Sequence, residues 1–283
     1  MRRARNRFIA STMSAGAVTG SSLPSPFTAA DAYEHFMGRW SRRLAPLFVE
    51  FAGVIAGDTV LDVGAGTGAL ATAAASVASV EVVGVDRSFD YVRAARASLG
   101  RGRFHVGDAR ALALADRRFT RALSLFTMNF LPDAPAAVRE MVRATRPRGV
   151  VAAAVWDYGR AMTMLRAFWD EAAAVKAAAK AHDERHMPLC RPGELEALWR
   201  QSGLEHVTHE PIDIDLPFAS FDDYWAPFLG GQGPAGAYVT TLDDADRIVL
   251  EARLRRRLLG GRPDGPFSLH ARAWAVRGVV PER

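Results

Sequence analysis

The sequence predicts an α/β fold in which an open, mostly parallel sheet carries helices on both faces. From Asp58 onward, short runs rich in valine alternate with alanine- or leucine-rich helical stretches. This alternation is typical of parallel strands joined by helical crossovers. With 283 residues, 49% of them hydrophobic, the chain can bury a full core in one large domain. In such a sheet we expect a ligand site beyond the carboxyl ends of the strands.

Five strands and the helices between them follow in order. Ser88 and Asp133 are the side chains expected to cap the second and third of these helices. The expected strands are 59–63, 81–85, 104–106, 122–126 and 150–156, and the expected helices are 68–77, 88–99 and 134–145.

The pattern changes after residue 156. A long alanine-rich helix is expected over about 161–181, and a second over 192–202 that ends at Gly203. A strand at 207–216 and a last strand at 268–277 are then separated by about fifty residues, with helical segments near 220–229 and 242–259. An insertion between the last two strands, at the ligand end of the sheet, is a candidate lid.

These elements define the expected domain organisation. Residues 1–28 begin with paired arginines, but serine, threonine and glycine break the apolar stretch that a secretory signal needs. We expect a flexible tail there, or a true start at Met13. One domain is expected over 29–283, with a core at 58–156, a helical insertion at about 157–190 and a lid at about 218–265.

The charge of the chain does not favour a nucleic-acid partner. Four of the five net positive charges come from arginines in the first eight residues, which leaves about +1 for the rest. The run Arg253 with 255–257 accompanies leucines in a helix-like segment and indicates a solvated helix face rather than a phosphate-binding patch.

Cysteine and histidine usage argues against a metal site. The single cysteine, Cys190, excludes an internal disulfide and a cysteine-cluster metal site, and it fits a reducing cytoplasm. His182 and His186 are four residues apart, but no third ligand accompanies them, so we expect no metal. The apolar stretch at 150–156 is far short of the roughly 20 residues of a membrane span.

The stretch VLDVGAGTGAL at 60–70 contains two nucleotide-binding spacings. Gly64, Gly66 and Ala69 satisfy G-x-G-x-x-A, the spacing of a dinucleotide site, whereas Gly64, Gly66 and Gly68 satisfy the tighter G-x-G-x-G. A dinucleotide site must hold an anionic pyrophosphate. Asp62, two residues before the first glycine, would repel that anion but could accept hydrogen bonds from an ammonium group.

Two further acids follow the next two strands. Asp86 is the last residue of VVGVD, where a carboxylate can accept hydrogen bonds from both hydroxyls of a ribose. Asp108 in FHVGDA, together with the backbone of Ala109, could bind the amino edge of an adenine. An acid after each of three successive strands suits an adenosine that carries an amino acid and no phosphate. S-adenosylmethionine is such a molecule. An NAD-dependent oxidoreductase remains the alternative that the G-x-G-x-x-A spacing allows.

With these residues in place, the sequence resembles the class I S-adenosylmethionine-dependent methyltransferases, and more narrowly the type 11 methyltransferase domain. The matching segments are VLDVGAGTGAL, VVGVDRS, GDA at 107–109, SLFTMNFLPD at 124–133 and RPRGVV at 146–151. The resemblance implies a Rossmann-like, seven-stranded sheet whose last strand is antiparallel. It extends upstream to YEHFMGRW at 33–40, which resembles a segment that caps the cofactor.

The resemblance also implies roles for individual residues. Tyr33 and Arg39 would face the methionine carboxylate, and Arg87 or Phe89 would pack on the adenine. His35 is the histidine expected to reach the methyl group as a catalytic base. The full set of expected cofactor contacts is Tyr33, Met37, Arg39, Asp62, Gly64, Ala65, Gly66, Gly68, Asp86, Arg87, Gly107, Asp108, Ala109, Phe126, Thr127 and Asn129.

A small, lipophilic or aromatic molecule is the expected methyl acceptor. The strand-four segment lacks the Asn-Pro-Pro-Tyr stretch of enzymes that methylate nucleic-acid bases, and aromatic residues gather in the insertions. A third reading is a protein that keeps the cofactor as a charged prop for a cyclisation or a binding role. The expected acceptor contacts are Phe130, Trp156, Tyr158, Trp169, Trp225, Phe228 and Gln232, although aromatics at helical spacing could equally seat the lid on the core.

Overall fold

The computed structural model describes residues 30–100 and 102–282, so the expectation for residues 1–28 lies outside the described part. The strands are β1 Thr59–Val63, β2 Glu81–Asp86, β3 Arg103–Val106, β4 Phe119–Leu125, β5 Thr145–Trp156, β6 Glu205–Phe218 and β7 Phe267–Val279. The α-helices are α1 Ala30–Tyr33, α2 Arg39–Phe51, α3 Ala69–Ala75, α4 Phe89–Leu99, α5 Ala134–Ala144, α6 Thr163–Val175, α7 Glu194–Gln201, α8 Phe221–Leu229, α9 Gly233–Thr240 and α10 Asp244–Leu259. Short helical turns are η1 Glu34–Gly38, η2 Met128–Phe130, η3 Ala177–Ala181 and η4 Glu184–His186.

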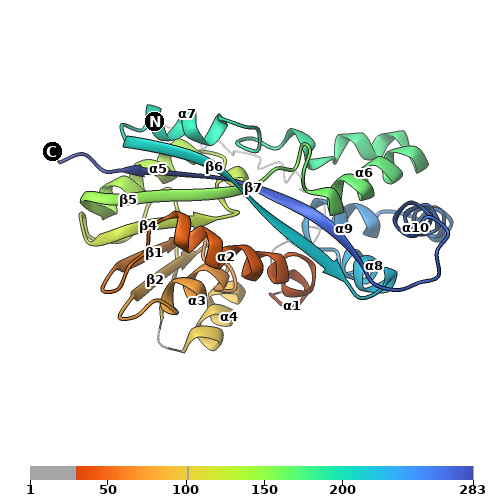
Figure 1. Ribbon diagram of the computed structural model, residues 1–283, viewed down its shortest axis with the longest axis horizontal. Coiled ribbons are helices and arrows are strands. Elements are labelled where there is room, and N and C mark those ends of the chain that lie inside the picture. The colour runs from red at the N-terminus through yellow and green to blue at the C-terminus, as the bar shows by residue number, and fades with distance from the viewer. Residues whose placement is uncertain (1–29, 101, 283) are drawn as a thin grey trace, which may run out of the picture.

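The strands form one seven-stranded sheet in the order β3-β2-β1-β4-β5-β7-β6. β7 runs antiparallel to both of its neighbours, whereas β1 to β5 pair in parallel. Figure 1 shows α2, α3 and α4 on one side of the sheet and α5 and α7 on the other. The predicted Rossmann-like sheet with an antiparallel last strand is confirmed.

Burial explains why the central strands were visible in the sequence. Val60, Leu61 and Val63 of β1 and the run 151–155 of β5 are fully shielded from solvent. Strands covered on both faces read as continuous apolar runs. The predicted caps are also confirmed: Ser88 Oγ accepts from the Tyr91 amide, and Asp133 Oδ1 accepts from the Ala136 amide.

The prediction of one long helix over about 161–181 is wrong for the second half of that range. α6 ends at Val175 because Lys176 adopts an extended conformation, and the chain continues in the 3-10 turn η3. Arg166 on α6 forms an ion pair with Asp183 at 2.5 Å, which brings the following segment back against the helix. A tertiary contact therefore overrides the helix preference of the alanines.

β6 and β7 extend beyond the rest of the sheet as a two-stranded ribbon. β5 pairs with β7 only from Ala273 to Val279, but the β6–β7 ladder continues to the pair Phe218 and Phe267. In Figure 1 both arrows run past the other strands to the group formed by α8, α9 and α10. The insertion between the last two strands is therefore carried at the far end of this ribbon.

Two helical segments go beyond the sequence expectations. The stretch from Ala30 to Phe51 is α1, the π-helical turn η1 and α2 in succession. α9 begins at Gly233, within the glycine-rich stretch 230–234. π-helical turns occur often at functional sites.

Candidate active site

A cavity of about 880 Å³ opens at the carboxyl ends of β1 to β4. Its volume lies near the top of the range of roughly 300–1,000 Å³ found for small-molecule sites. The wall also includes the N-terminal helical segment, the chain after β5 and the start of α9. Of the sequence-predicted residues, it contains Tyr33, Met37, Asp62, Gly64, Ala65, Gly66, Asp86, Arg87, Gly107, Asp108, Ala109, Phe126, Thr127, Phe130, Trp156, Tyr158 and Gln232.

The glycine loop after β1 uses its backbone amides internally. The amides of Gly64 and Ala65 both donate to Val85 O, at 2.8 and 3.0 Å. The Gly66 amide donates to Asp86 Oδ2 at 2.9 Å. Gly68, which precedes α3 and is not part of the cavity wall, donates to Ala65 O. The amides with which such a loop would hold a pyrophosphate are therefore already paired.

Gly64 is fixed as glycine by close packing. Its φ is +76°, and a Cβ at this position would lie 2.2 Å from Thr127 Oγ1 and 2.6 Å from Thr127 Cβ. Gly66 has φ +53°, but a Cβ there would have no neighbour within 4 Å. The two glycines therefore share a left-handed backbone but differ in the space around them.

Gly64→Ala is expected to lower the free energy of unfolding by about 2–5 kcal/mol. Left-handed backbone strain accounts for roughly 1–2 kcal/mol, and overpacking against the stiff, branched Thr127 for about 1–3 kcal/mol more. Gly66→Ala is the matched control and should show the backbone strain alone. Urea unfolding of both variants measures the difference, and equal losses would show that the contact with Thr127 is not tight.

Asp62 is a buried carboxyl group without a well-formed hydrogen bond in the described part of the chain, although the backbone amide of Ala71 acts to lower its pKa. The carboxyl group is fully shielded from solvent. Burial, and next the nearby charge of Asp86, raise the pKa of Asp62 to about 8. An acceptor left unpaired in a cavity wall is suited to a ligand that brings a donor, such as an ammonium group.

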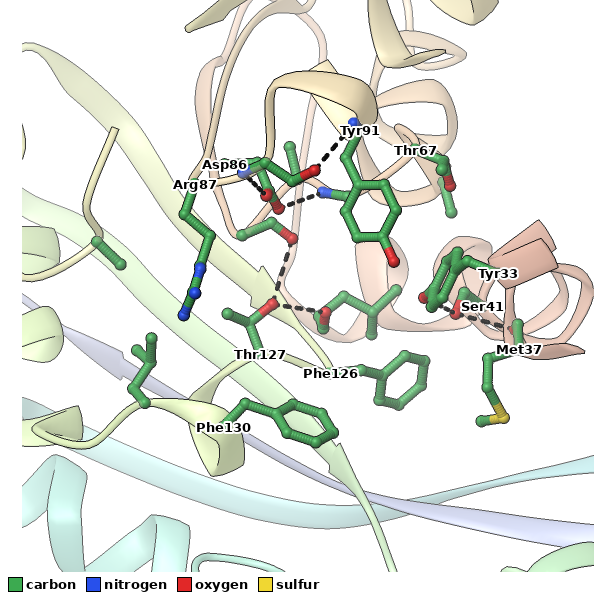
Figure 2. Close-up of a pocket in the computed structure, with 18 of the residues that line it drawn as sticks. Tyr33, Met37, Ser41, Thr67, Asp86, Arg87, Tyr91, Phe126, Thr127 and Phe130 are labelled. Atoms are coloured by element: carbon green, nitrogen blue, oxygen red, sulfur yellow. Dashed lines mark hydrogen bonds between the residues drawn. The ribbon is translucent and has the colours of Figure 1, made fainter. Parts of the chain in front are cut away.

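Asp86 connects the glycine loop with the start of α4. Oδ2 accepts from the Gly66 amide, and Oδ1 accepts from the Ser88 amide at 2.8 Å, as the dashed lines of Figure 2 show. Burial raises the pKa of this half-buried carboxyl group, although the two backbone hydrogen bonds oppose the shift. The carboxylate is thus held in a fixed orientation at the cavity.

Asp108 differs from the other two acids because it is exposed and already paired. Arg110 donates to both of its oxygens, at 3.0 Å from Nε and 2.7 Å from Nη2, and holds the pKa of Asp108 at about 2. A ligand that approaches Asp108 must therefore share it with Arg110. Gly107 and the buried Ala109 lie on the cavity wall, as do the exposed Arg87 and Phe89 at its rim.

The N-terminal segment places Tyr33 and Met37 at the cavity but not its two basic residues. The Tyr33 hydroxyl is hydrogen-bonded to Ser41 Oγ at 3.1 Å (Figure 2). Arg39 lies outside the cavity wall because it forms an ion pair with Asp223 at 2.6 Å and packs over Trp40. His35 is exposed and its Nδ1 lies 3.3 Å from Asp31 O, so the structure does not place it toward a reacting methyl group.

On the acceptor side, the ring of Trp156 stacks on Phe126 at 4.0 Å, and Tyr158 and Phe130 stand nearby in the cavity wall. Gln232 is buried there, and its Oε1 has no hydrogen-bond partner within residues 30–100 and 102–282. The sequence had proposed Gln232 as a polar contact, and its position in the cavity wall agrees with that.

Four predicted contacts lie behind the cavity wall. Phe228 stacks on Phe168 at 4.6 Å and Trp225 packs beside it, so both seat α8 on the core. Trp169 Nε1 donates to Glu184. Asn129 is buried with its amide 3.7 Å from Met187 Sδ. For the three aromatic residues, the alternative that they seat the insertion on the core agrees with the structure.

Three cavity-facing features were not anticipated from sequence. Thr67 lies in the cavity wall, and its Oγ1 donates to Glu34, which lies outside the wall and forms an ion pair with Arg42. The Tyr91 hydroxyl is buried without a partner among the described residues, and Tyr91 lies on the wall opposite Phe126 and Phe130 in Figure 2. Glu184 is a buried carboxyl group in the wall. Of these residues, Thr67 and Glu34 lie in the segments 60–70 and 33–40 that the sequence analysis singled out, whereas Tyr91 and Glu184 do not.

The fold is that of an α/β protein with a cavity at the switch point of its sheet, between β1 and β4. Residues 60–149 match the family model described as a methyltransferase domain. This match covers the core of the sheet and supports the resemblance to the class I S-adenosylmethionine-dependent methyltransferases. The type 11 domain named from the sequence is a sibling of the matching family.

Known proteins similar to this chain agree with that assignment. Demethylmenaquinone methyltransferase of Renibacterium salmoninarum is 32% identical over 118 residues, 42% of this chain and 49% of the relative. The chain spans about half the length of the curated relatives it matches. Phosphoethanolamine N-methyltransferase 2 of Haemonchus contortus, solved with S-adenosyl-L-methionine, has a TM-score of 0.55 at 19% identity over 89% of this chain and 56% of that one.

The same fold also occurs in the [4+2]-cyclase SpnF, with a TM-score of 0.53 at 18% identity, covering 85% of this chain and 82% of that one. At such identities the likeness concerns the fold alone. Within the described ranges, no helix is both long and apolar enough to cross a bilayer.

Proposed function

We propose that this protein transfers a methyl group from S-adenosylmethionine to a small, lipophilic or aromatic acceptor by in-line displacement. The observation that supports this most is Asp62, a buried carboxyl group in the cavity wall whose oxygens make no well-formed hydrogen bond within the described residues. An amino acid-bearing nucleoside supplies an ammonium donor there, and its ribose hydroxyls can reach Asp86. When bound, this cofactor supplies an electrophilic methyl group on a positively charged sulfur.

The paired amides of the glycine loop disfavour the dinucleotide alternative. Gly64, Ala65 and Gly66 already donate to Val85 O and Asp86. Asp86, in the same wall, presents a carboxyl group that would repel a pyrophosphate. An uncharged ribose and a cationic amino acid do not incur this repulsion.

The chain's own residues would act by orientation and by exclusion of water. The stacked rings of Phe126 and Trp156, together with Phe130, present an apolar surface to an acceptor. Holding two reactants in line contributes up to roughly 7–11 kcal/mol in favourable intramolecular cases. The proposed lid at about 218–265 would close this side through Gln232.

Calorimetry with S-adenosylhomocysteine, together with NADH fluorescence, tests the cofactor assignment. We expect micromolar binding of the nucleoside and no fluorescence enhancement of NADH; the absence of nucleoside binding would overturn the proposal. Cell extract incubated with methyl-labelled cofactor and analysed by mass spectrometry should then reveal a labelled product. Binding without conversion across a broad panel would favour the cyclase or binding role instead.

A further inference from the structure

Glu184 is a further acidic group in the cavity wall, close to Tyr158. It is 5% exposed, and its Oε2 accepts a hydrogen bond from Trp169 Nε1 at 2.7 Å. No residue in the described ranges donates to its Oε1. One oxygen of a buried carboxyl group in the wall is therefore left for a ligand.

The break in the helix after α6 places Glu184 there. Asp183, its neighbour, takes the guanidinium of Arg166 at 2.5 Å and also accepts from the Arg185 amide. Arg166 is thereby committed to Asp183, and Glu184 has no ion pair of its own among the described residues. Adjacent carboxyl groups thus have opposite environments, a pattern that separates acid–base roles in enzymes.

The groups around Glu184 set its charge. Burial raises the pKa of Glu184 to about 7, opposed by the Trp169 hydrogen bond and by the charge of Arg166, with Asp183 acting to raise it. Tyr158 and Cys190 also face it, and both keep their protons because burial holds the pKa of each well above its usual value. Glu184 is the group in this cluster that changes charge near neutral pH.

Gln232 gives independent support for a donor-bearing acceptor molecule. Its buried Oε1 has no partner in the described part of the chain, and it lines the same cavity as Glu184. Two hydrogen-bond acceptors thus line the same cavity as the rings of Phe130, Trp156 and Tyr158. A flat molecule with an O–H group would satisfy such a wall.

We propose that the methyl acceptor is a phenol or a similarly acidic enol, and that Glu184 Oε1 takes its proton during methyl transfer. This inference rests on the proposed methyltransferase function. The acceptor oxygen forms a bond to the methyl carbon, and the electron pair of the broken sulfur–carbon bond stays on sulfur. The O–H proton passes to Glu184 and from there to solvent.

Acidity favours a phenol over an aliphatic alcohol. A phenol has a pKa of about 10, so its proton transfer to a group with a pKa of about 7 is unfavourable by about three powers of ten. For a hydroxyl as weakly acidic as water, with a pKa of about 15.7, the same proton transfer would be unfavourable by nearly nine powers of ten. A carboxylate with this pKa can serve as general base for the first class only.

The test compares three probes of one shape: 2-naphthol, 2-naphthylmethanol and 2-naphthylmethylamine, each with methyl-labelled S-adenosylmethionine from about pH 5.5 to about pH 9. We expect transfer to 2-naphthol alone, with kcat rising with pH and levelling above about 7, because the ionised carboxylate is the active form. Glu184→Gln should lower this kcat by about 10²–10⁴-fold while S-adenosylhomocysteine binding is unchanged. Glu196→Gln, the same change on the surface of α7, is the control.

Two further measurements separate a base from a merely structural residue. 4-Nitrophenol, which ionises without help, should be methylated by Glu184→Gln at close to the wild-type rate. Trp169→Phe removes a hydrogen bond that lowers the pKa of Glu184, so the rise in kcat should move to higher pH.

The proposal is overturned if Glu184→Gln retains the wild-type kcat and pH profile on 2-naphthol, or if the alcohol or the amine is methylated instead. It is also overturned if the protein binds S-adenosylhomocysteine but methylates neither phenol. If Glu184→Gln does not bind the nucleoside, an unmoved pH profile in Trp169→Phe overturns it. Failure of the wild-type protein to bind the nucleoside would be a failure of the proposed function itself.

Discussion

Asp86→Ala is expected to weaken the binding of S-adenosylhomocysteine by about 10²–10⁴-fold. A hydrogen bond to a charged group contributes about 1.5–3 kcal/mol, and two ribose hydroxyls would lose their acceptor, which together gives about 3–6 kcal/mol, or one factor of ten for each 1.4 kcal/mol. The amides of Gly66 and Ser88 would also lose Oδ2 and Oδ1, which loosens the loop on both sides. Isothermal titration calorimetry measures the change directly.

Glu81→Ala is the matched control for this prediction. Glu81 begins the same strand β2 that Asp86 ends, and it is exposed at the end of the strand away from the cavity. The control should bind the nucleoside as the wild type does. Similar affinities for both variants would show that Asp86 does not contact the ligand.

Asp62→Asn is expected to make the ligand-free protein more stable at pH 8 and to weaken its nucleoside binding. Because the pKa of Asp62 is raised from 3.8 to about 8, the folded state holds a proton between these pH values that the unfolded state has lost. The free energy of unfolding of the wild type therefore falls as pH rises through this window, by up to about 1.4 kcal/mol per pH unit. Because asparagine does not ionise, the free energy of unfolding of the variant does not decrease in this way.

Denaturant unfolding between pH 4 and pH 8 checks the linkage. The advantage of Asp62→Asn should be small at pH 4 and reach several kcal/mol at pH 8. Asp244→Asn, the same change at an exposed position on α10, is the control. A constant difference at every pH would contradict the assignment of a raised pKa to Asp62. Higher stability with weaker binding would show that this carboxyl group is kept for a ligand.

The sequence predicted those structural features that arise from interactions among a few neighbouring residues. β1 and β5 were predicted because burial on both faces leaves continuous apolar runs, and Ser88 and Asp133 because a cap acts within three residues. Asp62 and Asp86 were expected at one edge of the sheet because parallel strands bring their carboxyl ends together there, and both line the cavity. Each of these signals is contained in a few neighbouring residues.

The missed features arise from contacts between distant parts of the chain. Arg39 is taken from the cavity by Asp223, which lies 184 residues further along the chain. Glu184 reaches the wall because the Arg166–Asp183 pair reverses the chain after α6, at a place where alanines favour a longer helix. His35, in the π-helical turn η1, is exposed and does not line the cavity. None of these outcomes follows from periodicity or residue type.

The ribbon of β6 and β7 has a consequence for how this protein could diversify. The residues expected to hold the nucleoside lie on β1 to β4 and the N-terminal segment, whereas α8, α9 and α10 are attached through two strands beyond the sheet edge. Substitutions or length changes in these three helices need not disturb the parallel strands. We expect selectivity for the acceptor to be exchangeable between relatives by grafting this outer piece, with the cofactor chemistry inherited unchanged.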